Sequence, residues 1–177
     1  MLIPILIALA VVPIVFVVVV ATRPSEFRIT RTATISAPPS AVFAQVNDFH
    51  NWLAWSPWEK LDPALKRTYE GAPAKTGAIY SWAGNKQVGE GRMTLTKSRP
   101  SDLIRIKLEF LKPFAATNTA EFTFQPEGHQ TVVTWSMTGK HNFMSKAFCL
   151  FMNMDKMVGG DFEKGLASLK SVVEAVS

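Results

Sequence analysis

The segment SKAFCLFMNMDKMVGGDFEKGLASLKSVVEAV, residues 145–176, decides how the rest of the chain must fold. Its large apolar residues recur every three or four positions, which predicts one long amphipathic helix over Ser145–Val176. Gly159, Gly160 and Gly165 interrupt this pattern. Each glycine costs about 1 kcal/mol against alanine inside a helix. They therefore indicate either close packing of the helix on another element or open space for a ligand beside it. We favour ligand space near Gly159 and Gly160, and packing at Gly165.

The chain before this helix alternates between apolar and polar residues with the period of a strand. Phe27–Ile35 is the first predicted strand, and two short helices are predicted between Ala41 and Trp58. Six more strands follow, separated by turns rich in glycine or proline: Leu65–Gly71, Ala78–Ala83, Gly89–Ser98, Leu103–Leu111, Thr119–Gln125 and Thr131–Gly139. The sheet has one apolar face, and only the final helix is large enough to cover it. We therefore predict an α+β fold in which a curved antiparallel sheet of about seven strands wraps around a long C-terminal helix.

The chain begins with an apolar run, Leu2–Ala21, that contains no charged residue. Twenty helical residues span about 30 Å, the thickness of the hydrocarbon core of a bilayer. A cleaved signal peptide is the alternative, but such a peptide carries basic residues before its apolar segment. The first basic residue of this chain, Arg23, comes after the apolar run. We predict a transmembrane anchor at residues 1–22, a short linker at 23–26 and a ligand-binding domain at 27–177.

The charges that flank the apolar run predict the side of the membrane on which the domain lies. Arg23, Arg28 and Arg31 all follow the run. The positive-inside rule then predicts a single-pass membrane protein with its domain in the cytoplasm.

Composition excludes several classes of function. The net charge is +5, but the basic residues are dispersed, so we predict no nucleic-acid partner and a modest attraction to an anionic lipid surface. Cys149 is the single cysteine and lies among large apolar residues, so we expect it to be a buried small hydrophobe. The three histidines are scattered, and we predict no metal site and no cofactor.

Several motifs resemble those of one superfamily. They are Ile35–Phe43, Val46–Phe49, Trp55–Trp58, Gly89–Met93, Phe110–Phe114, Thr134–Met137 and Asp161–Leu166. In these segments the chain resembles the helix-grip fold of the START/Bet v 1-like (SRPBCC) superfamily, in its polyketide cyclase/dehydrase-like branch. The resemblance implies a deep apolar cavity between the sheet and the C-terminal helix. Members of the superfamily include aromatase/cyclases, lipid carriers, quinone-binding proteins and hormone receptors, so the resemblance is specific for fold and not for function. Some bacterial members that the chain resembles also carry a membrane anchor.

Aromatic and methionine side chains should converge where the sheet meets the helix. Core filling explains most of them, and a subset lining a pocket would suit a planar or isoprenoid ligand. The predicted ligand-binding residues are Trp55, Tyr80, Trp82, Phe110, Phe122, Trp135, Met157 and Gly160. No catalytic residue is predicted, and we interpret Asp48 beside His50 as a helix cap and not as the partner of a catalytic base.

Three hypotheses of function remain open. We favour a membrane-tethered binding module, not an enzyme, that takes a hydrophobic small molecule such as a lipid or a quinone-like compound into the cavity. One alternative is a polyketide cyclase or dehydratase, which would need an acid or base group inside the cavity. The other is an accessory subunit of a membrane protein complex, although the apolar run shows no packing motif.

Overall fold

The computed structural model describes the backbone of residues 2–176, with side chains for residue 9 and residues 11–176. The N-terminal helix α1 (Leu2–Thr22) leads into strand β1 (Glu26–Ile35). Four short helices follow: α2 (Pro39–Asn47), the 3-10 helix η1 (Phe49–Asn51), α3 (Trp52–Trp55) and the 3-10 helix η2 (Pro57–Lys60). Six strands come next: β2 (Lys66–Gly71), β3 (Ala78–Ala83), β4 (Glu90–Arg99), β5 (Leu103–Lys112), β6 (Ala116–Glu127) and β7 (Gln130–Lys140). Two helices, α4 (Phe143–Phe148) and α5 (Met154–Glu174), end the chain.

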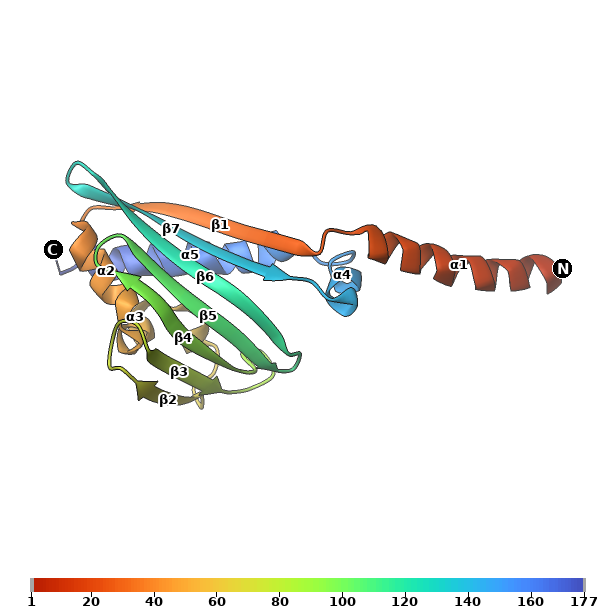
Figure 1. The fold of residues 1–177 in the computed structure, drawn as a ribbon, viewed down its shortest axis with the longest axis horizontal. Coiled ribbons are helices and arrows are strands. Elements are labelled where there is room, and N and C mark those ends of the chain that lie inside the picture. The colour runs from red at the N-terminus through yellow and green to blue at the C-terminus, as the bar shows by residue number, and fades with distance from the viewer. Residues whose placement is uncertain (1, 177) are drawn as a thin grey trace.

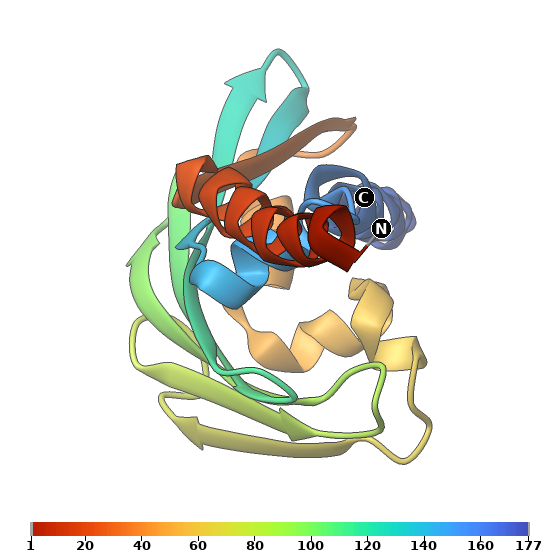
Figure 2. The same cartoon turned by 90° about the vertical axis from the view of Figure 1, so that its right-hand side faces the viewer.

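The strands form one seven-stranded sheet in the order β1-β7-β6-β5-β4-β3-β2, and every neighbouring pair is antiparallel. The alternation of apolar residues directs one face of each strand inward, as in Phe122 and Phe124 of β6, which are almost fully buried. Figure 2 shows the sheet curving around the short helices and α5. The predicted α+β helix-grip architecture is thus confirmed for the sheet and its C-terminal helix.

The single long helix predicted over Ser145–Val176 is wrong in one respect, because the chain breaks between α4 and α5. Asn142 caps the first helix by accepting a hydrogen bond from the backbone N–H of Ser145 at 2.8 Å. Asn153 caps the second by accepting one from the N–H of Lys156 at 3.0 Å. An asparagine side chain at this position satisfies a backbone donor that the first turn of a helix leaves free, so each cap starts a new helix.

The apolar N-terminal run is helical, but the structure does not support the predicted transmembrane helix. In the described part of the chain, no helix is long and apolar enough to cross a membrane. The side chains of residues 1–8 and of residue 10, which belong to the predicted anchor, lie outside the described residues, as does residue 177. The membrane location and the division into anchor, linker and domain therefore stay predictions.

Candidate functional site

The centre of the concave face is a closed aromatic cluster around Trp135 of β7. Its ring stacks on Phe162 of α5 with centroids 4.0 Å apart, and on Phe122 of β6 at 4.7 Å. Trp55 and Trp58, from the short helices, meet the same ring edge-on at 5.8 Å each. Stacked and edge-to-face rings at these distances fill the space between sheet and helix, so this part of the interface is core.

One buried donor in this cluster lacks a partner. Trp135 is 2% exposed, and its indole Nε1 makes no hydrogen bond within the described residues. A buried unpaired donor costs about 1–3 kcal/mol, so proteins rarely keep one without a reason.

A second row of aromatic side chains crosses strands β3 and β5 on the same face. The rings of Tyr80 and Trp82 are 6.0 Å apart, and those of Trp82 and Phe110 are 6.1 Å apart. Phe49 joins the row to the central cluster, since it contacts both Trp52 and Tyr80. The fold therefore brings the predicted aromatic residues onto one continuous concave surface.

The cover over this surface is uneven along α5. In the second half of the helix, Phe162, Leu166 and Leu169 are at most 2% exposed. In the first half, the inward residues Met154 and Val158 are only half-buried. Met157 and Gly160 lie on the outer side of the helix, in line with the exposed Lys164 and Ala167, so the open space beside Gly160 is solvent. The helix therefore closes one end of the concave face and leaves the other end open.

The sheet shows the same gradient. Along β5 the inward residues Ile104 and Ile106 are fully buried, whereas Leu108 and Phe110, nearer the end of the strand, are only half-buried. Trp82 on β3 is half-buried as well. The less covered part of the concave face lies at the end of the sheet from which α1 departs (Figure 1).

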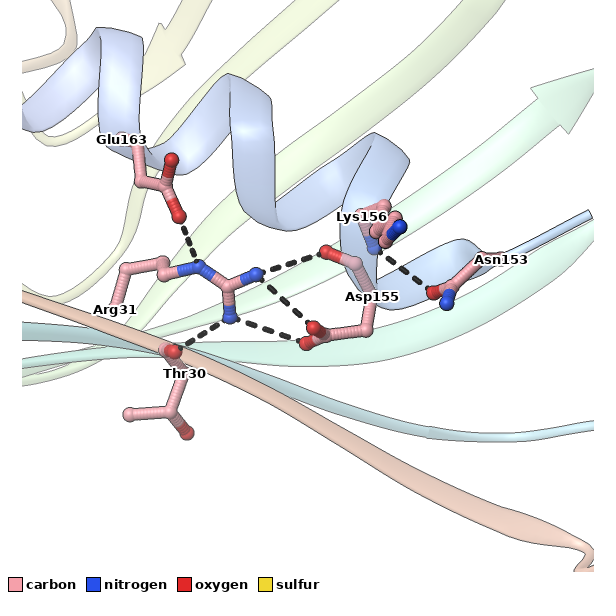
Figure 3. A network of polar contacts seen from close by, with 6 residues as sticks. All are labelled: Thr30, Arg31, Asn153, Asp155, Lys156 and Glu163. Atoms are coloured by element: carbon pink, nitrogen blue, oxygen red, sulfur yellow. Dashed lines mark hydrogen bonds and ion pairs between the residues drawn. The ribbon is translucent and has the colours of Figure 1, made fainter.

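Arg31 of β1 fixes the position of α5. Its guanidinium donates from both terminal nitrogens to the carboxylate of Asp155 at 3.0 Å, and Nε donates to Glu163 at 2.6 Å (Figure 3). The same group also donates to the backbone oxygens of Thr30 and Asp155. A bidentate contact of this kind fixes orientation as well as distance, so Arg31 acts as a clamp between the strand and two turns of the helix.

The Arg31 clamp explains one of the three glycines and corrects a prediction. A Cβ on Gly159 would lie 2.0 Å from the guanidinium of Arg31, so Arg31 occupies the space that we assigned to a ligand there. Gly165 is confirmed as a packing glycine, because its Cβ would lie 2.8 Å from the ring of Trp135. Gly160 faces open space, but on the outer side of the helix, where that space is solvent and not the concave face.

A polar network lies beside the second aromatic row. The carboxylate of Glu59, whose side chain is 7% exposed, accepts hydrogen bonds from the Tyr80 hydroxyl and from Arg67 Nε, the latter at 2.6 Å. Burial, and then the bond to Glu59, raises the pKa of Tyr80 far above its usual value. Burial also raises the pKa of Tyr69, whose hydroxyl is buried and finds no partner among the described residues. Both phenols are therefore protonated donors at neutral pH.

His50 and Asp48 have the structural role predicted for them. Asp48 caps the 3-10 helix η1 by accepting a hydrogen bond from the backbone N–H of His50 at 2.9 Å, and it also binds the ring Nδ1 at 2.7 Å. The imidazole stacks on Tyr69 with centroids 4.0 Å apart. With Tyr69, His50 lines a surface pocket of about 210 Å³ at the β2–β3 end of the sheet.

A second pocket, of about 270 Å³, lies where α1 meets β1 and α4. It includes Cys149, which is half-buried and lies 3.9 Å from Nε2 of His141, so the expectation of a fully buried cysteine is wrong. Ligand pockets usually measure about 300–1,000 Å³. Both pockets are smaller than this, and neither is the deep cavity between sheet and helix that the resemblance implies.

The predicted ligand-binding residues fall into three groups. Trp55, Phe122 and Trp135 belong to the closed cluster, and Tyr80, Trp82 and Phe110 form the second row. Met157 and Gly160 lie on the outer side of α5, away from the concave face. No bound ligand tests them, so their role stays a prediction. Sequence reasoning missed Arg31. The available signal was an arginine at an inward position of β1, together with the acidic residues Asp155 and Glu163 on a helix expected to cover that strand.

This geometry agrees with a family assignment. The family model described as polyketide cyclase/dehydrase and lipid transport matches residues 26–174, which is most of the chain. The chain therefore belongs to this family, and the predicted superfamily is confirmed. No curated protein matches the sequence significantly.

Solved structures show the same fold at low sequence identity. A protein from Thermobifida fusca is 19% identical with a TM-score of 0.64, and the match covers 85% of this chain and 95% of that one. A Staphylococcus aureus protein of unknown function is 10% identical with a TM-score of 0.64, covering 85% and 95%. The di-domain aromatase/cyclase StfQ of the steffimycin biosynthetic pathway is 13% identical with a TM-score of 0.63, and the match covers 85% of this chain and 51% of StfQ. At these identities the likeness concerns the fold alone.

Proposed function

We propose that the protein is a membrane-tethered module that binds a hydrophobic small molecule, either a lipid or a quinone-like compound. The ligand would lie between the half-buried aromatic row and the first half of α5. The observation that carries the proposal is the uneven cover of the concave face, where Phe110 and Trp82 on the sheet and the inward Val158 on α5 are only half-buried. A ligand that covers such apolar surface removes it from water, and this contributes about 25 cal/mol per Å² to the favourable free energy of binding. Met154, half-buried on the inward side of the first half of α5, provides a flexible apolar wall for such a ligand.

The tether in this proposal is α1. Its side chains from Leu9 to Val19 are apolar and exposed wherever they are described. A helix that is apolar all round is normally buried in a protein core or in lipid. A bilayer is where a hydrophobic ligand would also partition, so the tether would keep the open end of the site near its ligand.

The test compares two substitutions on the same helix. Val158→Phe enlarges an inward, half-buried side chain in the first half of α5, whereas Ala167→Leu adds volume at an exposed position on the outer side. The full chain and both variants are titrated with a fluorescent fatty acid and with a short-chain quinone, and the occupancy is measured in the same detergent. We expect Val158→Phe to fold and to lose binding at least tenfold, and Ala167→Leu to bind as the unmodified chain does. Equal binding by both variants would overturn the proposed site.

A cyclase or dehydratase remains the second candidate, because one observation favours it. The Tyr69 hydroxyl is a buried, protonated donor without a partner among the described residues, and its ring lies 5.3 Å from the ring of Tyr80, which donates to Glu59. Such a donor can protonate the β-hydroxyl group of a cyclised substrate, which then leaves as water while the α-carbon loses its proton to solvent. If the protein converts a synthetic poly-β-ketone with loss of water, detected by mass spectrometry, Tyr69→Phe should abolish the reaction. Conversion at an unchanged rate would remove Tyr69 from that role.

A further inference from the structure

Large apolar side chains are exposed at one end of the globular part of the molecule. Leu111 and Phe114, at the turn between β5 and β6, are 59% and 79% exposed. Four more come from α4 and the segment after it: Phe143, Met144, Phe148 and Phe151. Figure 1 shows α4 and this turn at the end of the sheet from which α1 departs, and we call these six residues the apolar end.

Exposure of this kind is not a general property of the surface. The large apolar residues of the sheet face the core, and most of them are almost fully buried. Single exposed apolar residues are common, but a group of phenylalanine and methionine side chains at one end marks a surface that binds a partner. The charged groups beside this surface indicate which partner it binds.

The second pocket supplies a basic centre beside the apolar end. It is lined by Arg23, Lys146 and His141, with Glu26 as the acidic member, and Nζ of Lys146 lies 3.5 Å from the backbone oxygen of Ala21 at the end of α1. Glu26 lies 3.8 Å from Lys140, whose side chain is 82% exposed. Cationic side chains therefore outnumber the carboxylate at the point where α1 leaves the globular part.

We propose that the apolar end and this basic pocket together dock on the surface of an anionic phospholipid bilayer. The aromatic and methionine side chains enter the boundary between headgroups and acyl chains, and Arg23 and Lys146 face the lipid phosphates. This combination of apolar and basic groups is what an interfacial surface needs, and neither a neutral small molecule nor a second copy of this basic chain complements it. The proposal extends the proposed function, which assigns membrane attachment to α1 alone, because it fixes the orientation of the site: the open end of the concave face meets the lipid.

The experiment measures which residues of the full chain contact lipid. In a Cys149→Ala background, a nitroxide spin label is attached to Phe151→Cys, Phe114→Cys or Val12→Cys, and the protein is reconstituted into phosphatidylglycerol vesicles. Glu127→Cys is the matched control, because it lies in the β6–β7 hairpin at the far end of the sheet (Figure 1). Collision rates with oxygen, which concentrates in lipid, and with a water-soluble nickel chelate are measured by electron paramagnetic resonance.

We expect labels at 151 and 114 to collide several-fold more with oxygen than with the nickel chelate, and the label at 127 to show the reverse. Labels at 151 and 114 that behave like the control would overturn the docking surface. If the label at 12 is in lipid at the same time, α1 is still a tether, so failure of this proposal is distinguishable from failure of the proposed function.

The basic pocket is tested separately in the same system. In phosphatidylglycerol vesicles, the double variant Arg23→Gln and Lys146→Gln should reduce the oxygen preference of the label at 151 at least twofold. In phosphatidylcholine vesicles it should have no effect, because these lipids carry no net charge. An identical oxygen preference with and without the two substitutions in phosphatidylglycerol would remove the basic pocket from the docking surface.

Discussion

At the scale of single residues, the glycines of α5 differ in what surrounds them, and alanine substitutions should reveal the difference. Gly160→Ala adds a methyl group to open space, and we expect it to raise the free energy of unfolding by up to about 1 kcal/mol because alanine favours the helix. Gly165→Ala pushes a methyl group against the ring of Trp135, and we expect it to lower that free energy by about 1–3 kcal/mol. Urea denaturation of the two variants checks both values. Equal effects would contradict the assignment of packing at one glycine and space at the other.

The residue scale also limits what the sequence could predict. The aromatic residues of the concave face were predictable, because alternation in each strand identifies which side chains point inward. The space beside Gly159 was not, because Arg31 fills it from a strand more than 120 positions earlier in the chain. Whether a glycine faces a ligand or a neighbouring side chain depends on contacts between distant segments, which the local pattern does not contain.

At the scale of elements, the Arg31 clamp makes the packing of α5 on β1 depend on pH. The hydrogen bonds and the charge of Arg31 hold the pKa of Asp155 below its ordinary value of 3.8. A carboxyl group with a lowered pKa in the folded state stabilises the fold above its unfolded pKa, and the contribution is lost as the pH falls through the lower, folded value. We therefore expect Asp155→Asn to reduce the melting temperature at pH 6, and the difference from the unmodified chain to shrink steadily below about pH 4.

Thermal unfolding at several pH values measures this difference directly. Lys164→Gln is a suitable control on the same helix, because Lys164 is exposed and forms its ion pair with Asp161 of the same helix. A difference between Asp155→Asn and the unmodified chain that is constant from pH 6 to pH 2 would show that the clamp does not contribute through its charge.

The elements themselves were predictable to different degrees. The strands follow from alternation and from turns marked by glycine and proline, and the seven strands were identified near their true positions. The break between α4 and α5 was hidden, because Asn153 lies within a run of apolar residues that continues the helical period. A cap acts through one side-chain hydrogen bond, and the periodicity of the surrounding residues does not show whether that bond forms.

At the scale of the whole molecule, the apolar end, the basic pocket and the open part of the concave face all lie toward α1. The apolar composition of residues 2–21 was evident from the sequence, but the gathering of Phe114 and Phe151 at the same end was not. These residues are far apart in the chain and lie at the same end because β5 ends on the side of the sheet where α4 packs against α1 (Figure 1). The folded arrangement thus brings the proposed tether, the proposed docking surface and the candidate ligand site to the same end.

This arrangement predicts how the molecule partitions between water and lipid. Val12→Lys places a charge in the middle of α1 at an exposed position and leaves the globular part unchanged. A lysine at the centre of a membrane-embedded helix costs about 2.5–3.5 kcal/mol, so we expect binding of the full chain to neutral vesicles to fall by about a hundredfold. Far-ultraviolet circular dichroism should be unchanged, because α1 contacts the globular part mainly through α4, at the opposite end of the helix from its N-terminus.

Glu127→Lys is the matched control for that measurement, since it introduces the same side chain at the exposed hairpin farthest from α1. It should bind neutral vesicles as the unmodified chain does. If Val12→Lys also binds without loss, α1 is not embedded in lipid, and any attachment to the bilayer must come from the apolar end. In that case substitution of Phe114 and Phe151 by serine should abolish vesicle binding, whereas with an embedded α1 the same pair should change the orientation of the globular part and leave binding in place.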